Sequence, residues 1–188
     1  GGRKMYICGR SSDKIHEWNV TGGVWSQQQK LQAESLPANS YFGGSVTIDN
    51  DGDTVVIGAP NTDTNNYGRA FVYTRSGTAW TQQSSLIHSD RSTGGSTSNF
   101  GYSMDLDHTG NLLMVGAPDV QTSNSPNGAV YLFERKGTNW KELKKYVASN
   151  PSSGDDFGEA VAIANDGLAF IVGAVSYTHL TLPTKRIV

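Results

Sequence analysis

An internal repeat dominates this sequence. Three stretches superimpose on one another: FGGSVTIDNDGDTVVIGAP from Phe42, FGYSMDLDHTGNLLMVGAP from Phe100 and FGEAVAIANDGLAFIVGA from Phe157. They recur at nearly constant spacing, which is the signature of a chain built from similar units that pack on their neighbours. Because one such unit cannot cover its own apolar faces, the repeat predicts an array or a ring of units.

A second shared block follows the first. It reads GRAFVYTRSGTAWTQQSSL from Gly68 and GAVYLFERKGTNWKELKKY from Gly128, and KIHEWNVTGGVWSQQQKL from Lys14 is a third copy. The sequence therefore holds the end of one repeat, two whole repeats and the start of another. We expect the corresponding units at residues 1–35, 36–90, 91–150 and 151–174.

Each whole repeat predicts four short β-strands. Four runs alternate in hydrophobicity and are separated by turn signals, which is typical of an antiparallel meander. In the second whole repeat, the strands are expected at 101–106, 111–116, 129–134 and 140–146. Glycine-containing turns join the first two strands and the last two. The connection between the second and third strands, 61–67 or 119–127, is the longest, polar and different in each copy, so we expect binding there.

A four-stranded unit of this length indicates a propeller blade. The sequence thus predicts an all-β fold, a partial β-propeller with two whole blades and two partial ones. Aromatic residues would fill the space between blades, glycines would permit close backbone approach, and prolines would end the second strands. We interpret the repeated motif residues as structural: Phe42, Gly43, Gly58, Ala59, Pro60, Trp80, Phe100, Gly101, Gly116, Ala117, Pro118, Trp140, Phe157, Gly158 and Gly173.

These motifs resemble the FG-GAP repeat, which also builds the head of the integrin α-chain. A Phe-Gly pair precedes a Gly-Ala pair in all three copies, and Pro60 and Pro118 complete the second motif in two of them. The resemblance covers nearly all of residues 1–174. It implies a propeller, usually of seven blades, that lies outside the cell or on its surface and serves in adhesion or in binding protein or carbohydrate. Two alternatives stay open: a non-catalytic propeller attached to a hydrolase or phospholipase elsewhere in the chain, and a structural spacer in a repeat array.

The side chains that could carry chemistry form no catalytic pattern in the sequence. His16, His88 and His108 fall at unrelated positions of the repeat, and we interpret them as surface residues. Neighbouring acids such as Asp155 and Asp156 do not place an acid and a base across a cleft. We therefore expect a binding module and not an enzyme. With 17 acidic and 15 basic residues, the chain carries no electrostatic footprint for nucleic acid, and no apolar run is long enough to predict membrane insertion.

The resemblance raises the question of calcium. Integrin-like blades carry an Asp-x-Asp/Asn-x-Asp-Gly-x-x-Asp loop in the first hairpin, whose oxygens can surround a calcium ion. Asp49, Asp51 and Asp53 lie in the corresponding hairpin and are the candidate ligands. Aligned on Gly58-Ala59-Pro60, however, the ligand positions fall on strand residues such as Val46 and Ile48. We expect a tight turn here, with no structural calcium and no other cofactor.

Residues 175–188, VSYTHLTLPTKRIV, break the repeat pattern. They resemble a translated sequencing adaptor. We interpret 175–188 as a non-native tail, and we expect a metagenomic reading frame that is cut at both ends. Cys8 is the single cysteine, so no disulfide can form within the chain, and we expect it to be a buried strand residue.

Overall fold

The computed structural model describes residues 4–9, 14–33, 36–62, 66–91, 97–122 and 125–175. These residues form antiparallel sheets and contain no helix. The first sheet, blade 1, has the order β1 (Lys4–Gly9), β2 (Lys14–Thr21) and β3 (Val24–Leu31). The last sheet, blade 4, pairs β14 (Ala160–Ile163) with β15 (Phe170–Gly173).

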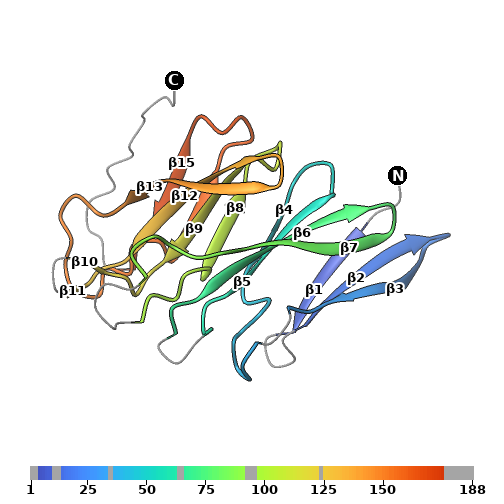
Figure 1. Cartoon of the computed structure of the whole chain (residues 1–188), viewed down its shortest axis with the longest axis horizontal. Coiled ribbons are helices and arrows are strands. Elements are labelled where there is room, and N and C mark those ends of the chain that lie inside the picture. Colours follow the sequence, from blue (N-terminus) through green and yellow to red (C-terminus); the bar gives the residue numbers. More distant parts are fainter. Residues whose placement is uncertain are drawn as a thin grey trace.

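Two four-stranded sheets lie between these. Blade 2 has the order β4 (Val46–Ile48), β5 (Thr54–Ala59), β6 (Arg69–Ser76) and β7 (Ala79–Leu86). Blade 3 has the order β8 (Ser103–Leu106), β9 (Leu112–Ala117), β12 (Ala129–Lys136) and β13 (Asn139–Tyr146). A small hairpin of β10 (Gln121–Thr122) and β11 (Ser125–Pro126) interrupts the β9–β12 connection. The four sheets follow one another side by side in chain order (Figure 1). The predicted all-β fold of propeller blades is confirmed.

The structure differs from the predicted strands in two places. The first strand of blade 3 begins at Ser103 rather than at residue 101, because Gly101 and Tyr102 lie in a turn that is closed by the N–H of Tyr102, which donates to the carbonyl of Asn99 at 3.0 Å. The connections 60–68 and 118–128 are also not the longest ones. Residues 87–102, which link β7 to β8, form a longer connection.

The second strand of blade 2 does not alternate in hydrophobicity, contrary to expectation. All residues of β5 are buried. Val55 and Ile57 pack into the core shared with blade 1, whereas Val56 packs into the core shared with blade 3. A strand that is covered on both faces needs apolar side chains on both, so its pattern becomes continuous. The apolar cores of this protein therefore lie between blades.

The geometry of the FG and GAP motifs explains why both contain glycine. A Cβ added to Gly58 would lie 2.0 Å from the carbonyl oxygen of Gly101 in the next blade, and one added to Gly116 would lie 2.0 Å from that of Gly158. Gly101 and Gly158 themselves have φ of 90° and 100°, a conformation that disfavours other residues. The two motifs thus meet across the boundary between blades 2 and 3 and across the boundary between blades 3 and 4, at a distance that no side chain allows.

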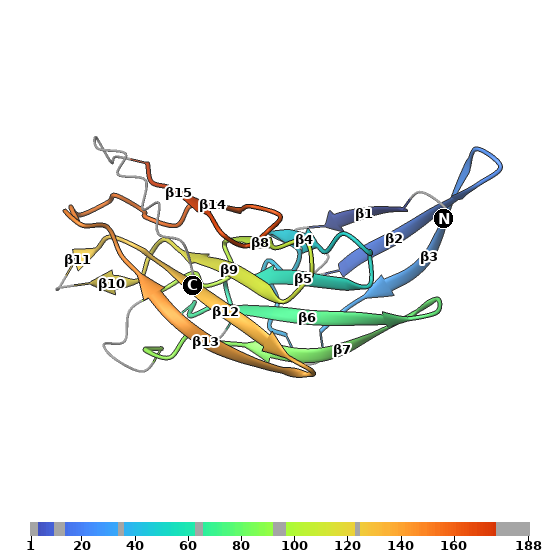
Figure 2. The same cartoon turned by 90° about the horizontal axis from the view of Figure 1, so that it is seen from above.

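Aromatic residues fill the boundaries between blades. Phe42 and Phe100 are fully buried, and each packs edge-to-face on two rings of the third strand of its own blade. The tryptophan that begins each fourth strand packs on the preceding blade: Trp80 Nε1 donates to Glu17 at 3.0 Å, and Trp140 Nε1 donates to Gln83 at 3.3 Å. The outer strands β7 and β13 lie along the same side of the molecule (Figure 2).

Candidate functional site

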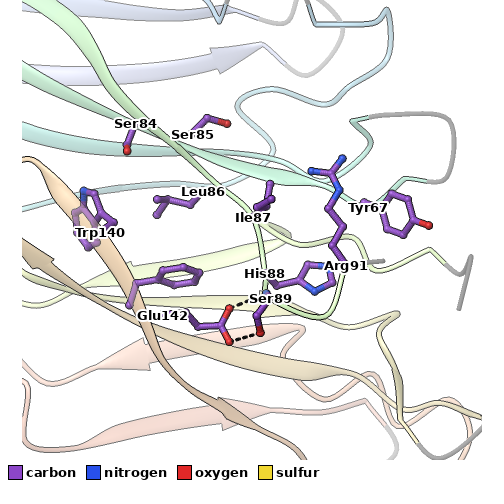
Figure 3. Close-up of a pocket in the computed structure, with 11 residues that line it drawn as sticks. Tyr67, Ser84, Ser85, Leu86, Ile87, His88, Ser89, Arg91, Trp140 and Glu142 are labelled. Atoms are coloured by element: carbon purple, nitrogen blue, oxygen red, sulfur yellow. Dashed lines mark hydrogen bonds between the residues drawn. The ribbon is translucent and has the colours of Figure 1, made fainter. Parts of the chain in front are cut away.

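A groove of about 770 Å³ lies between blades 2 and 3. It runs beside β7 and β13, the edge strands of two sheets that each have four strands. Trp140 lies at one end of the row of lining side chains and Tyr67 at the other (Figure 3). The volume falls within the roughly 300–1,000 Å³ that is typical of small-molecule sites. The lining mixes apolar, hydroxyl and oppositely charged side chains: Tyr67, Ser84, Ser85, Leu86, Ile87, His88, Ser89, Arg91, Phe133, Trp140 and Glu142.

Three segments build most of this groove. The end of β7 supplies residues 84–86, the connection that follows supplies residues 87–89 and Arg91, and β13 supplies Trp140 and Glu142. Of the two loops in which binding was expected, 61–67 contributes Tyr67 at one end, and 119–127 contributes no lining residue. The groove is therefore centred on the linker between blades, and binding through the tips of those loops stays a prediction.

Hydrogen bonds and ring contacts fix the groove's polar and aromatic groups. The carboxylate of Glu142 accepts the backbone N–H and the hydroxyl of Ser89, both at 2.8 Å. The guanidinium carbon of Arg91 lies 5.2 Å from the centre of the Tyr67 ring, within the range of a cation–π contact. Because Ser89 belongs to the linker and Glu142 belongs to β13, the first contact joins the two sides of the groove, and the contact of Arg91 with Tyr67 joins the linker to the β5–β6 connection.

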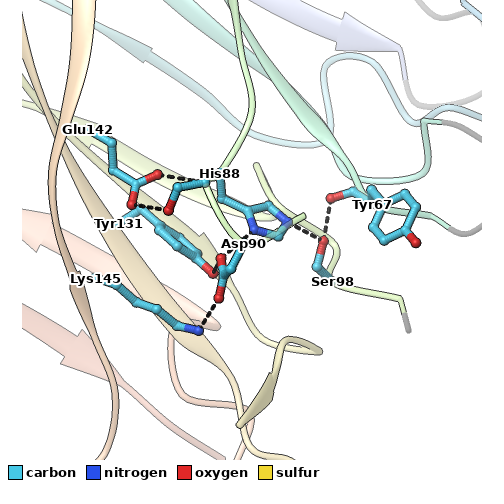
Figure 4. Close-up of polar contacts among 8 residues, drawn as sticks. Tyr67, His88, Asp90, Ser98, Tyr131, Glu142 and Lys145 are labelled. Atoms are coloured by element: carbon cyan, nitrogen blue, oxygen red, sulfur yellow. Dashed lines mark hydrogen bonds and ion pairs between the residues drawn. The ribbon is translucent and has the colours of Figure 1, made fainter. Parts of the chain in front are cut away.

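A polar network around the buried His88 adjoins the groove, and Figure 4 shows its contacts. His88 is 3% exposed, and its Nδ1 lies 2.7 Å from Asp90 Oδ1 while its Nε2 lies 3.0 Å from Ser98 Oγ. Asp90 also accepts the hydroxyl of Tyr131 at 2.7 Å and an ammonium hydrogen of Lys145. Since a carboxylate only accepts, Nδ1 carries the hydrogen of this contact. The network joins the linker to the third and fourth strands of blade 3.

The electrostatics of this network follow from burial and from Lys145. Burial lowers the pKa of His88 below its ordinary value, although Asp90 opposes this effect. Burial alone would raise the pKa of Asp90, but the hydrogen bonds from Lys145, Tyr131 and His88 together hold it well below its usual range. Burial and the neighbouring carboxylate raise the pKa of Tyr131. At neutral pH, the network therefore holds a neutral His88, an ionised Asp90 and a neutral Tyr131.

Ser98, His88 and Asp90 have the composition of a nucleophile triad, but the geometry argues against that use. The Ser98 hydroxyl donates to the carbonyl of Tyr67, and its single hydrogen cannot serve both this carbonyl and Nε2 of His88. Ser98 is 3% exposed and borders a cavity of about 20 Å³, which has room for about one water molecule. We interpret the three residues as structural, because their contacts hold the linker in place.

The expectation that His88 is a surface residue is wrong. The strands β3, β7 and β13 are the last strands of blades 1, 2 and 3. The second residue after each of these strands is buried, and it is Ala33 after β3 and Ala148 after β13. His88 occupies the same position after β7. Its partners also depart from the repeat, because Tyr131 aligns with Phe71 and Lys145 aligns with Ser85. Comparison of the repeats with one another, rather than a search for catalytic patterns, is the signal that identifies this cluster.

Comparison with protein-family models assigns the repeat. The FG-GAP repeat model matches residues 25–73, 80–133 and 140–179, which together make up more than half of the sequence. The chain belongs to the FG-GAP repeat family. Each matched FG-GAP segment begins at the tryptophan of a fourth strand, Trp25, Trp80 or Trp140, and continues through the first strands of the next blade. The family repeat therefore spans the blade boundary where the groove lies.

Two solved structures share the fold of this FG-GAP chain. A periplasmic gluconolactonase from Pseudomonas aeruginosa is 16% identical with a TM-score of 0.61, and the match covers 93% of this chain and 47% of that one. A putative 6-phosphogluconolactonase from Bacteroides fragilis is 13% identical with a TM-score of 0.54, and the match covers 78% and 36%. The chain thus spans less than half the length of either protein. No curated protein matches the sequence significantly.

The FG-GAP motif residues of the two whole blades are buried, with one exception. Trp140 is partly exposed, whereas its equivalent Trp80 is 5% exposed. Trp140 lines the groove as well as packing on blade 2. In the third copy, Phe157 and Gly173 are partly exposed and Gly158 is buried. The structural interpretation of these residues therefore omits one contribution, that of Trp140 to the candidate site.

The carboxylate of Asp49, the first calcium candidate, serves the hairpin itself. Its Oδ1 accepts the backbone N–H groups of Asp53 at 3.0 Å and Thr54 at 3.2 Å, and burial raises its pKa. Asp107 closes the next hairpin in the same way, with two backbone N–H groups at 2.8 Å. Asp51 is exposed. Within the described ranges, no group of three or more His, Cys, Asp or Glu side chains could hold a metal ion. The expectation of no calcium stays a prediction.

Two further expectations concern parts of the chain that lie outside this description. The side chain of Cys8 is not described, and of the tail 175–188 only Val175 is, with its N–H donating to the carbonyl of Asp155 at 2.8 Å. In the portion of the chain that the structure describes, no helix has the length and apolar character needed to cross a membrane.

Proposed function

We propose that this chain is a ligand-binding module of a secreted or cell-surface protein, and that its ligand occupies the groove between blades 2 and 3. The observation that carries the proposal is the groove itself, which is open to solvent, preformed and bordered by two whole blades. Membership of the FG-GAP family supports a location outside the cell, because the resemblance drawn from the sequence implies adhesion or recognition there.

A binding role without catalysis fits the groove's chemistry. Its one carboxylate, Glu142, is held by two hydrogen bonds from Ser89, and the nearby hydroxyl of Ser98 faces a carbonyl group in a cavity too small for a substrate. Neither arrangement supplies an acid and a base to one reacting atom. The two similar structures are lactonases, and at 16% and 13% identity they support the fold of this chain and not its activity.

A binding screen on the full chain tests the proposal. A glycan array and a phage-displayed peptide library would each be probed with the wild type and with Trp140→Ala, which removes one end wall of the groove. We expect at least one ligand class to bind the wild type and to bind Trp140→Ala at least about tenfold more weakly, a loss of about 1.4 kcal/mol. If no ligand binds, or if Trp140→Ala binds as tightly as the wild type, the alternatives are favoured. These are a propeller scaffold attached to a hydrolase or phospholipase, and a structural spacer.

The absence of catalysis is tested separately. Glucono-δ-lactone and a p-nitrophenyl ester would be incubated with the full chain, and hydrolysis would be compared between the wild type and Ser98→Ala. We expect equal rates at the uncatalysed level. Turnover that Ser98→Ala abolishes would identify the Ser98–His88–Asp90 arrangement as a working nucleophile and would contradict the proposal.

A further inference from the structure

We propose that the ligand of the groove between blades 2 and 3 is a neutral carbohydrate chain. This inference rests on the proposed binding function and names the class of molecule that the groove recognises. Its basis is the combination of aromatic rings, hydroxyls and balanced charges in one preformed groove, together with an edge strand whose shape disfavours an extended peptide.

Aromatic side chains stand at both ends of the groove, Trp140 at one and Tyr67 at the other (Figure 3). Each ring is held in place, since Trp140 Nε1 donates to Gln83 at 3.3 Å and Arg91 lies over the Tyr67 ring. The C–H face of a pyranose ring packs on an aromatic ring while its hydroxyls remain free at the edge, and Trp and Tyr combine apolar area with a polar tip in this way. Two such rings in one groove fit a chain of sugar units better than a single small molecule.

The polar groups between the rings match sugar hydroxyls. Ser84 and Ser85 of β7 supply hydroxyls that both donate and accept. Across the groove, the carboxylate of Glu142 is fixed by the two hydrogen bonds from Ser89, and each of its oxygens retains a lone pair for a hydroxyl of the ligand. Sugar hydroxyls can satisfy both kinds of partner at once, which an apolar ligand cannot do.

The charges of the lining favour a neutral ligand. Arg91 and Glu142 contribute one positive and one negative charge, and the pKa of His88 is lowered by burial, so that side chain is neutral at neutral pH. Behind the lining, Lys145 is paired with Asp90. A polyanion such as a uronic acid chain would meet the carboxylate of Glu142, and a polycation would meet the guanidinium of Arg91.

The edge of blade 2 disfavours the main competing ligand, an extended peptide. A peptide that adds a strand needs a regular row of backbone donors and acceptors. The pairing of β6 with β7 shifts register between Val72 and Tyr73, which leaves Gln83 as an extra residue beside the groove. A bulge of this kind twists the edge and interrupts the row, a device that blocks strand addition. The pairing of β12 with β13 shows the same shift across the groove.

Fluorine NMR and calorimetry on the full chain test this inference. The probes are neutral hexasaccharides of glucose, mannose, xylose and N-acetylglucosamine, with hexagalacturonate as the charged comparison. We expect at least one neutral probe to shift the resonance of fluorotryptophan at Trp140. In calorimetry, Trp140→Ala should weaken that probe at least about tenfold. Trp140→Tyr, which keeps an aromatic face, should retain most of the affinity.

Trp25→Ala is the matched control, because Trp25 holds the aligned position on β3, is 41% exposed and lies outside the groove. It should bind the neutral probe as the wild type does. If no neutral hexasaccharide binds but a library peptide does so in a Trp140-dependent way, the binding function stands and the carbohydrate class is overturned. If hexagalacturonate binds more tightly than every neutral probe, the neutral class is overturned. If nothing binds, both proposals fail.

Discussion

The boundary between blades 1 and 2 and the boundary between blades 2 and 3 are copies of one another, yet only the second is widely open. Their cavities measure about 360 Å³ and about 770 Å³. The two linings correspond position by position along the repeat. Gln29, Lys30, Leu31 and Gln32 of blade 1 align with 84–87 of blade 2, and Tyr73, Trp80 and Gln82 align with Phe133, Trp140 and Glu142.

The smaller cavity is narrowed chiefly by Gln29. Its amide accepts the backbone N–H of Trp80 at 3.0 Å and donates to the backbone carbonyl of Trp80 at 3.3 Å, so its side chain bridges the two blades. At the other boundary, the aligned residue is Ser84, whose side chain is much shorter. Trp80 is consequently 5% exposed, whereas Trp140 keeps a solvent-facing surface that lines the groove.

A second set of changes distinguishes the two boundaries. The hydroxyl of Tyr73 donates to Gln82 at 3.3 Å, but Phe133 has no hydroxyl, and the aligned Glu142 turns to Ser89 of the linker instead. The repeat frame thus fixes where a cavity forms between blades, and a few side chains decide whether that cavity is narrow or wide.

The largest expected effect is the loss of stability when the narrower boundary, between blades 1 and 2, loses its tryptophan. Trp80→Ala should lower the free energy of unfolding by about 3–5 kcal/mol, because it leaves a cavity between two blades and removes a donor from the buried carboxylate of Glu17. Trp140→Ala, at the open boundary, should lower it by about 1–2 kcal/mol. Urea unfolding of the full chain measures both. Equal losses would mean that the two boundaries do not differ in packing.

A smaller loss of stability is expected when residues at the boundary between blades 2 and 3 are replaced by those at the aligned positions of other blades. His88→Ala restores the residue found at Ala33 and Ala148, but it removes one polar contact from Asp90 and one from Ser98. We expect a loss of about 1–3 kcal/mol, which is the usual range for a buried polar group that loses its hydrogen bond. Adding Tyr131→Phe and Lys145→Ser, which restore the blade 2 residues, should cost less than the sum of the separate changes, since all three share Asp90. Full additivity, measured by the same unfolding experiment, would contradict a coupled network.

The sequence predicts the blades and their order, but it does not predict which boundary between blades holds the wider groove. Phe100, Gly101 and Pro118 recur because every blade needs the same close contacts, so periodicity alone indicates blades and their order. The groove depends instead on side chains that do not recur. Whether Gln29 reaches Trp80 depends on the distance between two blades, and the network of His88 and Asp90 draws its members from a linker and from two strands that are separated in the sequence. A search for repeated patterns passes over such residues because they are the exceptions to the repeat.

Acidification should destabilise the boundary between blades 2 and 3. It should not destabilise the boundary between blades 1 and 2 in this way, because that boundary has Ala33 at the position of His88. Because burial holds the pKa of His88 below its ordinary value, the unfolded chain takes up this proton first as the pH falls. The contribution of His88 to stability is thus fully present above about pH 6.5, the ordinary value for histidine, and is lost as the pH falls toward the folded-state pKa. The depressed pKa of Asp90 adds a further loss below about pH 4.

Urea unfolding as a function of pH, compared between the wild type and His88→Ala, isolates the histidine contribution. The difference between the two proteins should shrink as the pH decreases from about 6.5. If the wild type gained stability relative to His88→Ala on acidification, the imidazolium would be the form that the network stabilises. The hydrogen bonds to Ser98 and Asp90 would then outweigh burial.

Exchanging the residues at the position of Gln29 and Ser84 should change the solvent exposure of the two boundary tryptophans, Trp80 and Trp140. Gln29→Ser removes two hydrogen bonds to the backbone of Trp80, at about 0.5–1.5 kcal/mol each, and opens the cavity between blades 1 and 2. Ser84→Gln should place the same bridge over Trp140 and close the groove. Acrylamide quenching of fluorotryptophan, resolved by residue in fluorine NMR, follows both changes without any ligand. We expect Trp80 to become accessible in the first variant and Trp140 to become protected in the second. Unchanged quenching in both variants would show that the backbone spacing of the blades, and not this one position, sets the width of each cavity.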